Sequence, residues 1–273
     1  MKKLVMFFLL VGGSVFAQSK ETRQVSDFST IKSSQSIEVN FTYGGTKSVV
    51  VEVEKSEHMK DVKTEVSGGQ LRIYIDQEKK KNWSFNSNDF GKVKVTVSNP
   101  TLEGVALSSS SKFNLLNKAK AKSFDVKVSS SARYNGELVQ ADNLSLEASS
   151  SASIDGKFEV MNSASLSASS SAKVEASLKA KSASLGVSSS ARINVSGSAT
   201  TADASASSSG SIKGGDFTVK TLDGKASSSG SMLFNVTDEV SGRASSSGKV
   251  TYTGGAKIIS SNTSSSGKVS KVD

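Results

Sequence analysis

Residues 126–134 read VKVSSSARY, and the pattern within this stretch occurs nine times in the chain. Each copy holds three serines, a small residue, a polar residue and then an apolar residue. A period of 18 to 21 residues with this little scatter is typical of a stacked repeat array. The serine triplets are Ser108–Ser110, Ser129–Ser131, Ser149–Ser151, Ser169–Ser171, Ser188–Ser190, Ser207–Ser209, Ser227–Ser229, Ser245–Ser247 and Ser264–Ser266.

Alternate positions around each triplet are apolar or small, and the positions between them are polar. In the repeat quoted above, the first set is Val126, Val128, Ser130, Ala132 and Tyr134. Because side chains alternate between the two faces of a strand, the first set should face a core and the second set water. If the whole phrase is one extended strand, the middle serine points inward and its two neighbours point outward.

A second, less regular apolar patch follows within each repeat and indicates a second strand per rung. Each rung then folds back on itself, and stacked rungs form parallel sheets. We therefore predict an all-β fold, a parallel β-helix-like solenoid with rungs of about 20 residues, flat or irregular in section, and roughly 40 Å long. The patches are Leu138, Phe158–Val160, Leu178, Val195, Phe217–Val219, Leu233 and Ile258–Ile259.

The residue after each triplet is always small. Since Ala occupies it four times, the position does not require a positive φ, and the constraint is volume. Gly replaces Ala in the last four repeats, where Gly224 and Gly242 also replace an inward leucine, so we expect the core to narrow toward the C-terminus. The small residues are Ser111, Ala132, Ala152, Ala172, Ala191, Gly210, Gly230, Gly248 and Gly267.

Residues 18–100 lack the repeat and form an N-terminal β-region that should pack on the solenoid of residues 101–273. Alternating apolar residues predict its strands, and Gly68-Gly69 marks a hairpin turn. Asn99-Pro100, which holds the only proline of the chain, should mark the transition to the repeats. The expected strands are 37–41, 49–53, 62–66, 71–75 and 93–97.

Residues 1–17 have the features of a secretory signal peptide. Lys2 and Lys3 precede an apolar run over residues 4–11, and Val15-Phe16-Ala17 offers a cleavage site before Gln18. An uncleaved membrane anchor is the alternative. We expect export to the periplasm, the outer surface or the medium, with no transmembrane segment after signal cleavage. The chain has no cysteine, so its stability depends on packing and backbone pairing.

The formal charge of +9 falls on residues spread over the repeats, and Lys79-Lys80-Lys81 is the only basic run. This charge predicts solubility and weak attraction to acidic surfaces. Nucleic-acid binding would need basic clusters with interleaved aromatic residues, so we do not expect it.

Taken together, the leader, the N-terminal β-region and nine in-phase rungs resemble the "putative autotransporter adhesin, head GIN domain" family of secreted and periplasmic proteins from Bacteroidetes-type bacteria. The resemblance covers about residues 23–269, including the segments Arg23–Ile31 and Val93–Pro100. It implies a β-helix-like fold and no established activity. The sequence lacks a Gly-Ile-Asn tripeptide, Arg192-Ile193-Asn194 being the nearest, and no translocator follows the last rung, so autotransport is not expected.

Catalytic motifs are absent from the sequence, which predicts a protein that is not an enzyme and needs no cofactor or metal. Four Ser-x-x-Lys matches recur as by-products of the repeat and fall on expected strands, whereas that motif works at a helix start. The single histidine, His58, lies in a polar segment, where we expect a solvated side chain. Paired carboxylates of a carbohydrate-active enzyme stay a weak alternative, because acidic residues in the repeats are sparse.

One irregular segment, residues 77–91, is a candidate binding loop. It joins a basic run to aromatic residues that could stack on a sugar or contact a partner, and the alternative is a loop that caps the solenoid core. Its candidate residues are Lys79, Lys80, Lys81, Trp83, Phe85 and Phe90.

Three functions compete for a rod of this kind. The first is an envelope or surface protein, such as an adhesin, that binds glycans or proteins along its long faces. The second is a purely structural envelope spacer. The third is an array of outward serines that orders water, as in ice-binding solenoids, although those favour threonine.

Overall fold

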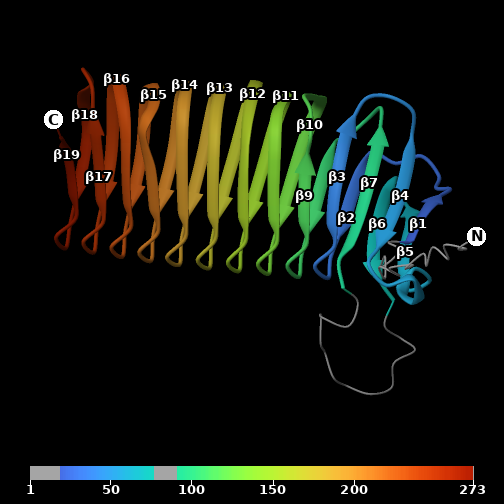
Figure 1. Ribbon diagram of the computed structural model, residues 1–273. Helices are drawn as coiled ribbons and strands as arrows, with labels where there is room; N and C mark the ends of the chain where they lie inside the picture. Colours follow the sequence, from blue (N-terminus) through green and yellow to red (C-terminus); the bar gives the residue numbers. More distant parts are fainter. Residues whose placement is uncertain (1–18, 77–90, 273) are drawn as a thin grey trace, which may run out of the picture.

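The structure is a computed structural model that describes residues 19–76 and 91–272 (Figure 1). Within these residues the regular elements are strands, apart from the short 3-10 turn η1 (Ser56–His58). The strands stack into one long rod, which confirms the all-β solenoid prediction. The N-terminal strands are β1 (Ser19–Arg23), β2 (Thr30–Ser33), β3 (Glu38–Tyr43), β4 (Ser48–Val53), β5 (Val62–Ser67), β6 (Gln70–Ile75) and β7 (Val93–Asn99).

The strands of the rod follow in chain order along its length, from green to red in Figure 1. They are β8 (Gly104–Leu107), β9 (Lys112–Leu115), β10 (Ala119–Val128), β11 (Arg133–Ala148), β12 (Ser153–Ala168), β13 (Lys173–Val187), β14 (Arg192–Ala206), β15 (Ser211–Ala226), β16 (Ser231–Ala244), β17 (Lys249–Thr253), β18 (Lys257–Thr263) and β19 (Lys268–Lys271). Neighbours from β8 onward pair in parallel, as stacked rungs require.

Each long strand makes two passes across the rod, with a bend between them. In β11 and β12 the register shifts at the bend, between Ala141 and Asn143. The two passes face each other across the core: a methyl group placed on Gly242 would lie 2.7 Å from a methyl carbon of Val269, which comes from the opposite pass. The rung is therefore flat, with two facing layers, as the second apolar patch predicted.

The predicted inward columns are in register and buried. Val126 aligns with Leu146, and Tyr134 aligns with Ile154, so apolar side chains stack on like side chains from rung to rung. Aromatic residues lie in the core at both ends of the rod: the Phe113 ring stacks on Tyr134 with ring centres 5.7 Å apart, and the ring centres of Phe217 and Phe234 are 6.3 Å apart. The predicted second patch fails at three places: Leu138 and Leu233 are only half-buried, and Ile258 and Ile259 are exposed on β18.

The serine triplets are turns, so the prediction that they continue a strand is wrong. The middle and third serines have φ values of 46–53° and 60–63°, the left-handed region, and both are exposed in every triplet. The first serine is half-buried in every triplet except the last, where Ser264 is exposed. The tight turn leaves the alternation of inward and outward side chains unbroken. Val128 and Ala132 therefore face inward whether the triplet is a turn or a strand.

The rod begins before the first serine triplet. β2 and β3 pair in parallel with β8 and β9, and the segment Ser34-Gln35-Ser36 between them also turns through two left-handed residues, Gln35 and Ser36, with φ values of 61° and 59°. Antiparallel pairs β1–β4, β4–β7 and β5–β6 cover this end of the core (Figure 1, blue to teal). The division into regions 18–100 and 101–273 stays a prediction.

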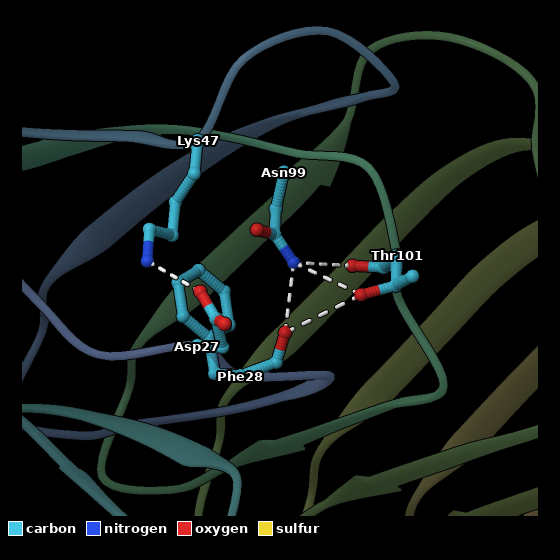
Figure 2. Close-up of polar contacts among 5 residues, drawn as sticks. All are labelled: Asp27, Phe28, Lys47, Asn99 and Thr101. Atoms are coloured by element: carbon cyan, nitrogen blue, oxygen red, sulfur yellow. Dashed lines mark hydrogen bonds and ion pairs between the residues drawn. The ribbon is translucent and has the colours of Figure 1, made fainter.

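A polar clamp around Asn99 holds this N-terminal cap to the first rungs (Figure 2). The buried Asn99 amide Nδ2 donates to the carbonyl oxygens of Phe28 and Thr101, both at 2.8 Å. Beside it, the Lys47 ammonium donates to the exposed Asp27 carboxylate at 2.6 Å. That hydrogen bond and the positive charge of Lys47 lower the pKa of Asp27.

Candidate functional site

The nine serine turns and the Ser34-Gln35-Ser36 turn line up along one long edge of the rod, the lower edge in Figure 1. We call this line the turn edge. In each turn the small residue that follows the triplet donates its backbone N–H to the first serine carbonyl, as from Ala132 to Ser129 at 3.1 Å. The third serine N–H donates to the middle serine carbonyl of the next rung, as from Ser131 to Ser150 at 3.0 Å. Backbone groups are thus paired along the edge, while its hydroxyl groups face solvent.

The small residue after the turn packs against the backbone of the preceding rung and is buried in every repeat except the last. A Cβ atom on Gly230 would lie 2.3 Å from the Ala206 carbonyl oxygen, and one on Gly267 would lie 2.2 Å from that of Ala244. Neither glycine has a positive φ. This confirms that volume, rather than backbone conformation, selects the residue here.

Basic side chains border the turn edge on both sides. On one side, the position two residues after the triplet forms a parallel column in which six of nine residues are basic and exposed. We call these six the basic column. They are Lys112, Arg133, Lys173, Arg192, Lys249 and Lys268.

On the other side of the edge, the position two residues before the turn carries Lys32, Lys127, Lys225 and Arg243. A shallow groove of about 450 Å³ runs here between the flanking side chains and the first serines of four triplets, with Lys32, Lys127 and Glu147 in its lining. A second groove of about 400 Å³, lined by Lys225 and Arg243, lies farther along the same side.

Most of these flanking cations have no anionic partner within the described part of the chain. The recorded exceptions are Lys127 with Glu147 at 3.4 Å, Lys173 with Glu175 at 2.6 Å, and Arg243 with Asp223 at 4.0 Å. The hydrogen bond from Lys173 is the main cause that lowers the pKa of Glu175. The turn edge is therefore a hydroxyl-rich surface between two positively charged borders, which suits reversible binding of an extended anionic or polar partner.

The predicted signal peptide lies outside the described residues, and so do the candidate loop residues Lys79, Lys80, Lys81, Trp83, Phe85 and Phe90. The four lysines of the Ser-x-x-Lys matches belong to the basic column, each following a serine of a turn. His58 is not solvated as expected. Its side chain is 10% exposed and its Nδ1 lies 3.4 Å from Asp61 Oδ2.

Sequence reasoning missed the basic column because it counted charges along the chain. Stepping through the sequence by one repeat, two positions past each triplet, would have revealed it. Among the described residues, no group of three or more potential metal ligands comes together, and no helix is long and apolar enough to cross a membrane.

The fold and its exposed edge define a class, the β-solenoid proteins. Within it, the chain belongs to the family described as "Putative auto-transporter adhesin, head GIN domain", which it matches over residues 27–162 and 155–256. The resemblance seen in the sequence is thus confirmed. A search of curated proteins finds no match.

Solved structures share the fold over nearly the whole chain. A putative adhesin from Parabacteroides merdae is 21% identical with a TM-score of 0.70, covering 94% of this chain and 96% of its own. A putative lipid binding protein from Parabacteroides distasonis is 19% identical with a TM-score of 0.62, covering 94% and 97%. A putative adhesin from the same species is 20% identical with a TM-score of 0.61, covering 94% and 98%.

Proposed function

We propose that this chain is an exported, non-enzymatic protein of the cell envelope that binds a glycan or a protein, as an adhesin does. The observation that carries the proposal is the turn edge, a continuous exposed surface. It is bordered by cations, most of which have no anionic partner among the described residues. Its family and two of its structural neighbours are named as adhesins, which supports a binding role. Solenoids commonly bind partners along such extended surfaces.

The test is binding of the exported chain to arrays of glycans and envelope proteins, with a variant that blocks the edge. Ser171→Glu/Ser190→Glu places two bulky anions on exposed turn positions of adjacent rungs. The matched control Ser165→Glu/Ser184→Glu places the same groups on the exposed sheet face of the neighbouring strands. We expect the edge variant to lose at least tenfold in retained ligand and the control to bind like the original chain.

Two results would contradict the proposal or move it elsewhere. A chain that retains nothing on any array would be a structural envelope spacer. Loss of binding in Trp83→Ala/Phe85→Ala, with the edge variant unaffected, would transfer the site to the loop predicted from the sequence. Thermal unfolding of each variant checks that it is folded.

A further inference from the structure

Within the described residues, the excess positive charge is confined to the borders of the turn edge. The twenty positions that flank its ten turns hold ten basic residues and two acidic residues, Glu38 and Glu147. The other described residues hold 19 basic and 20 acidic side chains, so they are close to neutral. A field of one sign along one edge of a neutral rod attracts anions to that edge rather than to the surface as a whole.

Within the basic column the charges come as pairs on adjacent rungs. Lys112 aligns with Arg133, Lys173 with Arg192, and Lys249 with Lys268. Parallel neighbours lie about 4.8 Å apart, and like charges directly opposite each other destabilise a sheet. Within the described chain, an ion pair is recorded only for Lys173 among these six residues. An external anion would remove this repulsion.

The spacing of the pairs indicates an extended ligand. Ser153 separates the first pair from the second, and Ser211 and Ser231 separate the second from the third. Cations thus recur over about nine rungs, roughly 40 Å, and the two grooves found beside the edge among the described residues are shallow. Arg133 and Arg192 add planar guanidinium groups, which bind sulfate, phosphate or carboxylate through two parallel hydrogen bonds.

The rest of the edge favours a sugar chain over other polyanions. Two exposed hydroxyls per triplet offer donors and acceptors to sugar hydroxyls. The triplets and their flanking positions contain no aromatic residue on which a nucleic-acid base could stack. The exposed large apolar residues, which a membrane would need, lie at other positions: Leu116, Met161, Ile258, Ile259 and Val272.

We infer that the turn edge binds a linear anionic polysaccharide, whose sulfate, phosphate or carboxylate groups contact the basic column while its hydroxyls contact the serine turns. This inference rests on the proposed function and names its ligand class. Binding then weakens with salt, because each cation that contacts the ligand releases a counterion from it.

The experiment measures the affinity of the exported chain for dextran sulfate and for neutral dextran of equal length over a series of salt concentrations. Arg133→Gln/Arg192→Gln removes two charges from the column. The matched control Lys181→Gln/Lys220→Gln removes two charges from exposed positions near the bends, at the opposite edge. We expect the column variant to lose roughly tenfold or more in affinity, with a salt slope lower by about one for each residue removed. The control should keep its affinity within about twofold.

Equal losses in both variants would show that binding follows net charge, and would overturn the assignment to the edge. If neutral dextran bound as tightly as dextran sulfate, the inference that the ligand is anionic would be overturned. Tighter binding to vesicles of anionic phospholipid, or to duplex DNA, than to dextran sulfate would overturn the glycan. Binding on the arrays described above without binding to dextran sulfate would overturn this inference and leave the proposed function standing.

Discussion

The two halves of the rod use the same turn around cores of different width. In the N-terminal half Ala follows each of four consecutive turns, so the core beside the turn has room for a methyl group. In the C-terminal half Gly follows the turn, and Gly224 and Gly242 leave room for Val250 and Val269 from the opposite pass. The φ values of the turn serines hardly differ between the halves. The turn is thus independent of core width, and the residue after it adjusts to the width.

Gly230→Ala tests this difference in core width and should have the largest effect on stability. The added methyl would lie 2.3 Å from a backbone oxygen, so the rungs must separate, and we expect a loss of about 3 kcal/mol in the free energy of unfolding. Denaturant unfolding measures it. The reciprocal change Ala172→Gly, in the wide half, should cost only about 1 kcal/mol. Equal costs would refute the difference in width.

Asn99→Leu tests the cap that only the wide end possesses. The change leaves the carbonyl groups of Phe28 and Thr101 without their donor, which should cost about 2 kcal/mol in unfolding free energy. Asp27→Asn is the control, since it removes the neighbouring exposed ion pair and should leave the melting temperature unchanged. If both variants melt at the same temperature as the original chain, the clamp does not hold the cap.

Tyr134→Phe should stabilise the wide core. The Tyr134 hydroxyl is fully buried and has no hydrogen-bond partner among the described residues, so its removal should raise the unfolding free energy by about 1 kcal/mol. Burial also raises the pKa of this hydroxyl. The original chain should therefore lose stability as the pH rises above about 10, where the unfolded tyrosine ionises, and the variant should lose less. Urea titrations at pH 8 and at pH 10.5 compare them, and parallel losses would contradict the assignment.

The smallest effect concerns the turn itself. Ser170→Gly/Ser171→Gly relieves two left-handed residues and should stabilise by up to about 1 kcal/mol, because the gain is partly offset by the entropy of glycine in the unfolded chain. Ser228→Gly/Ser229→Gly, in the narrow half, should have the same effect within about 0.5 kcal/mol, the usual uncertainty between independent sites. A large difference in melting temperature between the two variants would show that turn strain depends on core width.

Most of the fold could be predicted from the sequence. The repeat period gives the length of one rung, and the alternation of apolar and polar residues gives the two faces of a strand. The inward positions Val126, Val128, Ala132 and Tyr134 are correct. The prediction that Ser130 faces inward is wrong, because the two-residue turn leaves the alternation of the flanking side chains unchanged. The flanking residues therefore cannot distinguish a turn from a continuous strand. Serine is also not the usual residue for a positive φ, which Gly and Asn favour, so no turn signal was visible.

The candidate site was less predictable. Arg133 and Arg192 are 59 residues apart in the chain and become members of one column only after the register is known. Burial of His58 likewise depends on packing of η1 in the cap, which local polarity does not reveal. The loop from Lys79 to Phe90 remains a prediction.

The hydrogen-bonded series of serine turns determines how the length of the rod can change. Each turn exchanges hydrogen bonds only with its immediate neighbours, and the same closure operates whether the core is wide or narrow. Adding or deleting one unit of about 20 residues therefore changes the length of the rod by one step of about 4.8 Å and leaves the other steps intact. The distance between the cap and the far tip of the rod is therefore set by the number of whole rungs.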